Sequence, residues 1–239
     1  MSRLITKVGS FFLDTLYNTQ LQKLNTIFED NHLIAVNKPS GMLVQGDKTG
    51  DLCLIDYTKE YIKETYNKPG NIFCGCIHRI DRPVSGLVLM AKTSKALERM
   101  NKIFSQREVQ KTYWALVDKK PMNIKDTLTH YIIKNEQQNK VKAYNKPTPN
   151  ALQAVLEYEL IKQLGTQYIL EVKPHTGRPH QIRSQLAAIG CTIVGDVKYG
   201  SPAPLADAAI GLHAKELRFI HPVKNEEVYI DAKVPKLFL

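Results

Sequence analysis

Short apolar runs broken by turn-forming residues recur along the chain from about Ile27 to the C-terminus. In residues 156–160 and 168–173 every second position is apolar, which is typical of half-buried strands. Gly165 lies between these two runs and predicts an antiparallel pair joined by a tight turn. Further extended runs are residues 27–36 and 41–45, which flank a turn at 37–41, and residues 111–117, 192–194, 212–219 and 227–230.

Three other segments repeat their apolar residues at helical spacing. The first covers residues 52–66, and the second begins at Ser94. The third is about three turns long, with Pro179 at its first position and Gly190 as its stop. Strands outnumber helices and do not alternate with them as in β-α-β proteins, so the sequence predicts an α+β fold.

The length and the cysteine content narrow the class of protein. The chain has 239 residues, and no stretch approaches the roughly 20 uncharged apolar residues that a membrane helix needs. Asp14 interrupts the apolar run near the N-terminus, which argues against a signal peptide. Four scattered cysteines do not make a disulfide framework. We therefore expect a cytoplasmic protein with reduced thiols, and a monomer because no long exposed apolar stripe is evident.

The charge balance is basic. Lys and Arg total 33 against 23 for Asp and Glu, which gives a formal net charge of +10. An excess of this size is consistent with a solvated basic surface or with a polyanionic partner such as nucleic acid. Charge alone leaves both interpretations open.

A first cluster of chemically capable residues is His78, Arg79, Asp81 and Arg82, which crowd into five positions between apolar runs. Positive charge on both sides should keep the carboxylate of Asp81 ionised at neutral pH. Such a carboxylate serves either as part of an ion-pair lock or as a nucleophile, and the residues themselves favour the lock.

A second cluster lies in eleven residues that contain no acid: Lys173, His175, Arg178, His180, Gln181 and Arg183. Because these side chains coincide with a predicted helix start, they favour a phosphate-binding surface over a merely basic helix face. Histidines and the aspartate of the two clusters match no standard metal-ligand spacing, so we predict no metal site.

Tyr113 and Trp114 are adjacent on a predicted strand and must point to opposite faces. One of the two rings belongs in the core, and the other is free to stack on a base. The spacing does not say which.

The run HRIDRPVSGLVLMAK (residues 78–92) resembles the catalytic motif of the RluA-type pseudouridine synthases. Four more segments resemble the family in the family's order: VNKPSGMLV (36–44), KTYWALV (111–117), residues 173–200 and LHAKELRFIHP (212–222). The resemblance runs from about Ile27 to the C-terminus. It implies a mixed, mostly antiparallel sheet with flanking helices and a central basic cleft.

By this resemblance, the chain isomerises specific uridines in ribosomal or transfer RNA to pseudouridine, with base flipping and without a cofactor. Asp81 is then the catalytic nucleophile, and Arg183 the basic residue that pairs with it. Tyr113 packs against the target base, so Trp114 faces away. Arg79 fills the space that the flipped nucleotide leaves. The implied RNA-binding set is completed by Arg82, Lys173, Arg178 and His180.

Two departures from the family pattern are visible. Val84 stands where the family usually has Thr, and we expect only a local change in packing there. Residues 1–26 leave no room for the small basic RNA-binding domain of some relatives, so we expect an extension of unknown role before a catalytic domain at 27–239.

Two other function classes remain as alternatives. A non-catalytic RNA-binding protein on the same fold would be signalled most simply by loss of Asp81, which is present. A metal-dependent nuclease or phosphotransferase that works on RNA would need clustered carboxylates to hold Mg²⁺. Glu64, on a predicted helix, is the one acid within twenty residues upstream of Asp81.

Overall fold

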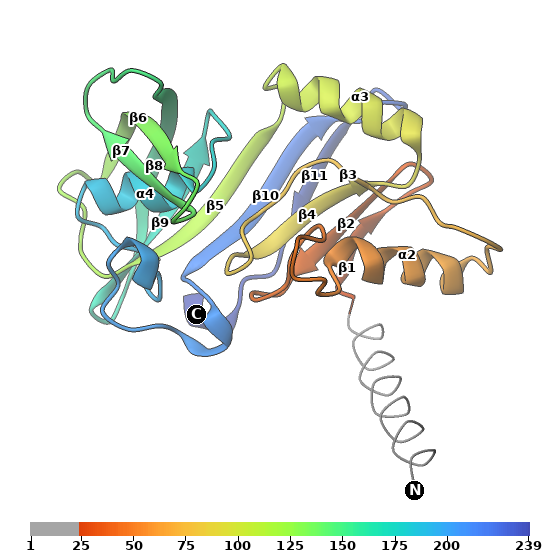
Figure 1. The fold of residues 1–239 in the computed structure, drawn as a ribbon, viewed down its shortest axis with the longest axis horizontal. Coiled ribbons are helices and arrows are strands. Elements are labelled where there is room, and N and C mark those ends of the chain that lie inside the picture. Colours follow the sequence, from red (N-terminus) through yellow and green to blue (C-terminus); the bar gives the residue numbers. More distant parts are fainter. Residues whose placement is uncertain (1–23) are drawn as a thin grey trace, which may run out of the picture.

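The computed structural model describes residues 24–239, and in this part of the chain eleven strands form one sheet (Figure 1). The predicted N-terminal extension therefore lies outside the described residues, apart from residues 24–26. The strands are β1 (Thr26–Glu29), β2 (Leu33–Lys38), β3 (Gly75–Cys76), β4 (Ser85–Ala91), β5 (Gln110–Val117), β6 (Lys125–Asn135), β7 (Lys140–Tyr144), β8 (Leu152–Leu164), β9 (Gln167–Pro174), β10 (Leu212–Ile220) and β11 (Glu227–Asp231).

The sheet has the order β1-β2-β4-β10-β5-β9-β8-β6-β7, with β3 beside β4 and β11 beside β10. Strands β4 and β10 are parallel, and the other pairs among the described residues are antiparallel. The predicted α+β class with a mixed, mostly antiparallel sheet is thus confirmed. The predicted pair around Gly165 is β8 and β9.

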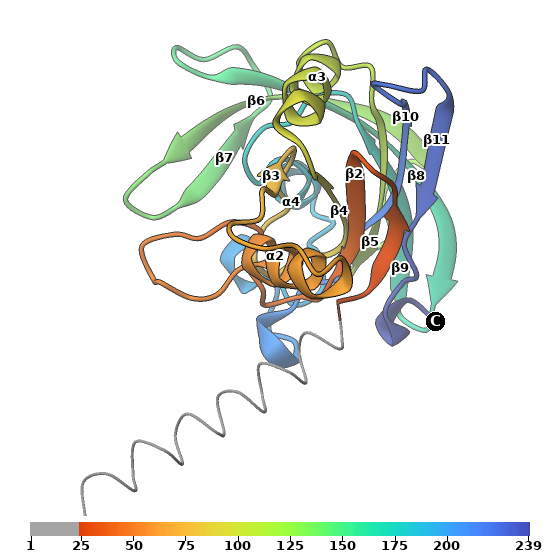
Figure 2. The same cartoon turned by 90° about the vertical axis from the view of Figure 1, so that its right-hand side faces the viewer.

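Helices α2 (Leu54–Thr65), α3 (Ser94–Ser105) and α4 (Gln181–Ala188) lie on the concave side of the curved sheet (Figure 2). Helix α3 contacts β3 and β4, whereas α4 contacts β6 and β7 at the other end. Short 3₁₀ turns lie at Val197–Tyr199, Ala206–Ala208 and Lys236–Phe238. Among the helices of the described part, none is both long enough and apolar enough to cross a membrane.

The core is centred on β4, all seven residues of which are buried. Its sequence SGLVLMA shows no alternation, because β2 and β10 flank it on both edges and packing covers both of its faces. The core cluster continues through β2, β5, β9 and β10. The loop that precedes β4 is consequently anchored on the most buried strand of the sheet.

The prediction for α4 was wrong at its start. His180 adopts the left-handed conformation, with φ 48° and ψ 24°, so the chain turns there and Pro179 lies outside the helix. The predicted stop is confirmed, because Gly190 has φ 78° and its N–H donates to the carbonyl of Ala187. The helix is therefore about two turns long rather than three.

The prediction of extended runs at 27–36 and 41–45 was also partly wrong. The first run folds into two strands, β1 and β2, because Asp30 accepts from the N–H groups of His32 and Leu33 and turns the chain. Residues 41–45 form no strand; the N–H of Gly41 instead donates to the carbonyl of Arg82. Residues 192–194 contribute an isolated bridge between Ile193 and Val117 and no strand.

Candidate active site

A cavity of about 1820 Å³ opens at the centre of the sheet. Loops from both halves of the chain line it, mainly residues 41–47, 78–84, 104–113, 173–183 and 195–198. Its lining includes nine Lys or Arg side chains against four Asp side chains. The predicted central cleft is therefore present, and its charge favours an anionic ligand.

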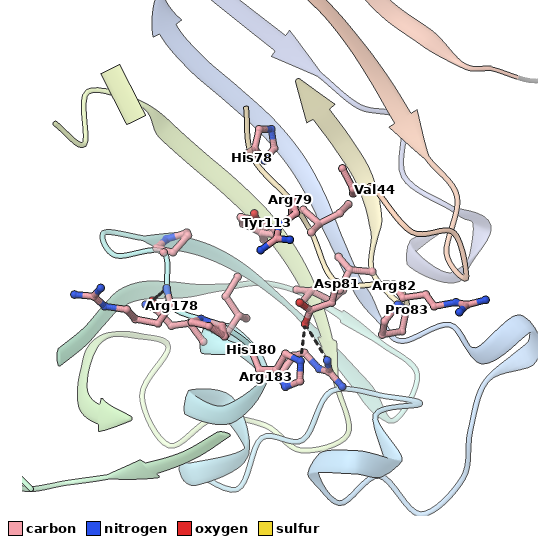
Figure 3. A pocket seen from close by; sticks show the side chains of 18 of the residues that line it. Val44, His78, Arg79, Asp81, Arg82, Pro83, Tyr113, Arg178, His180 and Arg183 are labelled. Carbon is pink, nitrogen blue, oxygen red and sulfur yellow. Dashed lines mark hydrogen bonds and ion pairs between the residues drawn. The ribbon is translucent and has the colours of Figure 1, made fainter. Parts of the chain in front are cut away.

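Asp81 lies in the loop between β3 and β4 and faces this cavity (Figure 3). One carboxylate oxygen, Oδ2, accepts a hydrogen bond of 2.9 Å from Nη1 of Arg183 on α4. Asp81 keeps a side-chain exposure of 31 %. The carboxylate is thus held by one charged partner and remains accessible to a ligand.

Arg183 is itself held from behind by a residue that sequence reasoning did not identify. Its Nε and Nη2 atoms donate to the two carboxylate oxygens of Asp196, at 2.7 and 2.8 Å. Burial alone would lower the pKa of Arg183, but the hydrogen bonds and charges of Asp196 and Asp81 raise it above its usual value. The bidentate pair with Asp196 leaves Nη1 directed at Asp81.

A second contact to Asp81 comes from His180. Its Nε2 lies 3.8 Å from Oδ2 of Asp81, and its Nδ1 lies 2.9 Å from the hydroxyl of Tyr199. That hydroxyl also accepts from the backbone N–H of Val141 on β7. Burial lowers the pKa of His180, although Asp81 acts in the opposite direction. Tyr199 also places its ring 5.0 Å from the guanidinium carbon of Arg183, so it supports both partners of Asp81.

Tyr113 projects from β5 into the cavity, near Arg79 (Figure 3). Burial, together with the negative charge of Asp81, raises the pKa of its hydroxyl. Trp114 points to the other face, where it packs on Phe238 with ring centroids 6.4 Å apart. The structure therefore answers which ring is which: Tyr113 lines the cavity, and Trp114 packs against a hydrophobic cluster on the other face of the sheet.

Arg79 is exposed and lines the cavity on the same loop as Asp81. Arg82 lines it as well, but its guanidinium is occupied: Nη2 pairs with Asp51 at 3.0 Å and Nε donates to the carbonyl of Gly41. These contacts join the Asp81 loop to the loop after β2. RNA binding by Arg79 and Arg82 stays a prediction.

Beneath this loop lies Lys38, a fully buried lysine that sequence reasoning missed. Its ammonium donates to the carbonyls of Pro39, Met42 and, at 3.3 Å, Arg82. Burial lowers its pKa to about 7. The turn signal at residues 37–41 predicted the bend but gave no reason to bury a lysine inside it.

Arg178 lines the cavity and donates through Nε to the carbonyl of Gln153 on β8. Lys173 differs from Arg178 in having an acidic partner. Lys173 also lines the cavity, but its ammonium pairs with Glu171 at 2.7 Å. Binding of RNA by Lys173 stays a prediction, with less geometric support than that of Arg178.

His78 has a structural environment. Its Nε2 accepts from the backbone N–H of Leu89, and its ring stacks on Phe104 at 5.2 Å. Burial, with a smaller effect of Lys111, lowers the pKa of His78 to about 3. Over residues 24–239 no group of three His, Cys, Asp or Glu side chains is arranged to hold a metal ion.

The chain is similar in sequence to known proteins. The sequence profile described as RNA pseudouridylate synthase matches residues 32–188. The ribosomal large subunit pseudouridine synthase C of Rickettsia prowazekii is 32% identical over 89% of this chain and 68% of its own length. The tRNA pseudouridine synthase C of Vibrio parahaemolyticus is 28% identical over 89% of this chain and 91% of its own length.

Solved structures share the fold. Human RNA pseudouridylate synthase domain containing 4 superposes with a TM-score of 0.78, at 24% sequence identity and with 95% of each chain covered. Human RNA pseudouridylate synthase domain containing 1 has a TM-score of 0.72 at 23% identity, covering 92% of this chain and 86% of that chain.

Proposed function

The chain belongs to the RNA pseudouridylate synthase family, and from this premise we propose that it isomerises specific uridines of ribosomal or transfer RNA with Asp81 as the nucleophile. The observation that carries the proposal is the accessible Asp81 carboxylate, held by Arg183 at 2.9 Å in a basic cavity. The choice between ribosomal and transfer RNA follows the names of the relatives and is left to the experiment.

The reaction is an isomerisation in which no atom is gained or lost. The bond between N1 of uracil and C1′ of the ribose breaks, a bond between C5 and C1′ forms, and the proton of C5 is replaced by one on N1. An ionised carboxylate beside the base suits nucleophilic catalysis by either route, through the sugar or through the base. Arg183, whose Nη1 donates to Oδ2 of Asp81, orients the carboxylate for this attack.

A uridine inside a folded RNA reaches this carboxylate only after it leaves its stack, which costs a few kcal/mol. We place the flipped base against Tyr113, whose hydroxyl stays protonated because its pKa is raised. The exposed, long Arg79 side chain fills the vacated space, and a planar guanidinium can stack and bind phosphate there. Arg178 and His180 border the RNA on the opposite wall.

The test is pseudouridine mapping on RNA from cells that lack the gene, incubated with purified protein. The wild-type protein and Glu98→Gln should modify the same uridines, since Glu98 is exposed on α3 away from the cavity. Asp81→Asn should lower the rate by at least about a thousandfold while RNA binding persists. Wild-type activity in Asp81→Asn would remove the carboxylate from the mechanism, and modified tRNA or rRNA would identify the substrate.

We also propose a monomer that acts in the cytoplasm, as expected from the sequence. Sedimentation at several concentrations and fractionation of cells test these two points.

A further inference from the structure

Some cations of the cavity lining have no counter-charge among the described residues, and Lys111 is one of them. Lys111 lies on β5 and lines the cavity, yet its ammonium makes no hydrogen bond or ion pair with any described residue. Arg107, an exposed residue that also lines the cavity, is the charged neighbour that acts on the half-buried Lys111. Other basic residues of the site differ: Arg183 faces two aspartates and Arg82 faces Asp51.

The position of this lysine relative to the site follows from the strand. Lys111 and Tyr113 are two residues apart on β5, so their side chains share the cavity face. Two residues of a strand span about 6.6 Å. Because the proposed function puts the target base against Tyr113, Lys111 lies beside the same nucleotide and can reach a phosphate that flanks it.

On the other wall of the cavity, the residue next to the ammonium of Lys111 is a glycine. Gly177 lies in the loop before α4, and a Cβ added there would be 3.7 Å from Nζ of Lys111. The loop thus leaves free space directly beside an unpaired charge. The positive charges of Lys111 and Arg107 repel each other, and an anionic ligand bound between them would reduce this unfavourable electrostatic free energy.

We infer that Lys111 and Arg107 form a binding subsite for the backbone phosphate adjacent to the target uridine. The inference rests on the proposed function and adds to it a contact that acts on the RNA backbone rather than on the base. Burial and the charge of Arg107 lower the pKa of Lys111 in the free protein, as expected for a cation without a counter-charge.

The first experiment measures RNA affinity against salt concentration, in the Asp81→Asn background so that no turnover occurs. Lys111→Met should weaken binding about tenfold and reduce the slope of log K against log salt by about 1, because one phosphate contact is lost. Lys111→Arg should keep the wild-type slope. Lys162→Met, at an exposed position on β8, is the matched control and should change neither.

A second pair of variants leaves the lysine in place. Gly177→Asp puts a carboxylate beside Nζ, which should compete with the phosphate and reduce the slope as Lys111→Met does. Gly177→Asn has the same shape without the charge and should retain more of the affinity. Wild-type slopes in both Lys111→Met and Gly177→Asp would overturn the subsite.

The outcomes separate this inference from the proposed function. Pseudouridine formed by the wild-type protein together with unchanged slopes would reject the subsite alone. Reduced slopes, together with a wild-type protein that forms no pseudouridine, would support the subsite as an RNA contact and reject the proposed reaction.

Discussion

Arg183 connects the two carboxylates of the site, and its three hydrogen bonds to them are 2.7 to 2.9 Å long. Asp196 is buried, with an exposed fraction of 1%, whereas Asp81 is open to the cavity. The two acids therefore have different tasks: Asp196 fixes the guanidinium, and the guanidinium orients Asp81. Without Asp196, the buried arginine would keep its large desolvation cost but lose two of its three hydrogen bonds to carboxylates.

Replacing Asp196 should accordingly affect both stability and turnover. Asp196→Ala is expected to lower the free energy of unfolding by about 3–5 kcal/mol, the usual cost of removing one partner of a buried pair. The rate of modification should fall more than the affinity for RNA, because Arg183 no longer orients Asp81. Denaturant unfolding and single-turnover kinetics measure the two effects. Glu98→Ala, on an exposed helix face, should stay within about 0.5 kcal/mol of wild type. An Asp196→Ala protein as stable as wild type would contradict this account.

Among the residues of the site, sequence analysis identified those that stand in clusters of charged residues. Asp81 and Arg183 stand among other charged residues, and the family resemblance paired them. Asp196 and Tyr199 stand alone in GDVKYG, where a single acid and a single tyrosine carry no local signal. Their roles depend on a contact between α4 and the 3₁₀ turn at Val197–Tyr199, which no local pattern specifies.

Among the elements, β4 and β10 meet at an unusually close point. Gly86 has φ 112°, and a Cβ there would lie 2.3 Å from the carbonyl oxygen of Ala214. Glycine is required both by the backbone conformation and by the space. This contact belongs to the parallel pairing that fixes the loop of Asp81.

Gly86→Ala should therefore destabilise the fold by more than about 3 kcal/mol, since it combines a strained φ with a clash against backbone. Thermal and denaturant unfolding measure the loss. Gly46→Ala provides the control, because a Cβ at position 46 meets nothing within 4 Å. A Gly86→Ala protein of wild-type stability would show that β4 and β10 separate more easily than their packing indicates.

Two histidines, His78 in the loop before β4 and His213 on β10, make stability depend on pH. Burial lowers the pKa of His78 to about 3 and that of His213 to about 4. An unfolded histidine has a pKa of about 6.5, so below that pH the unfolded chain binds protons that the folded chain does not. The free energy of unfolding should thus decrease as pH falls from about 6.5 to 4, by up to about 1.4 kcal/mol per pH unit for each histidine.

Denaturant unfolding at pH 7, 6 and 5 measures this slope. His213→Gln should make this slope shallower, while His175→Gln serves as the control, because His175 is half exposed and contacts Glu157 at the surface. An unchanged slope in His213→Gln would assign the pH dependence to other groups.

Element prediction succeeded where one periodicity was strong, as for α2, α3, β5, β8 and β9. It missed β6 and β7, whose sequences mix lysines, a histidine and short apolar stretches. These strands pair with each other and with β8, so their structure depends on neighbours rather than on their own pattern.

For the whole molecule, the net charge of +10 and the nine cationic side chains of the cavity lining act together. RNA affinity should fall at least about a thousandfold between 50 and 200 mM salt if six or more phosphates are contacted. Binding titrations with Asp81→Asn over this range test the prediction. A slope of log K against log salt shallower than about −2 would mean that few of these charges touch the backbone.

The order of strands at the centre of the sheet has a further consequence for synthesis of the chain. β10, residues Leu212–Ile220, inserts between β4 and β5 and is one of the last strands to be translated. Until it leaves the ribosome, the half that carries Asp81 and the half that carries Arg183 have no common strand. The nascent protein therefore cannot assemble its cleft until β10 has been translated and has inserted between β4 and β5.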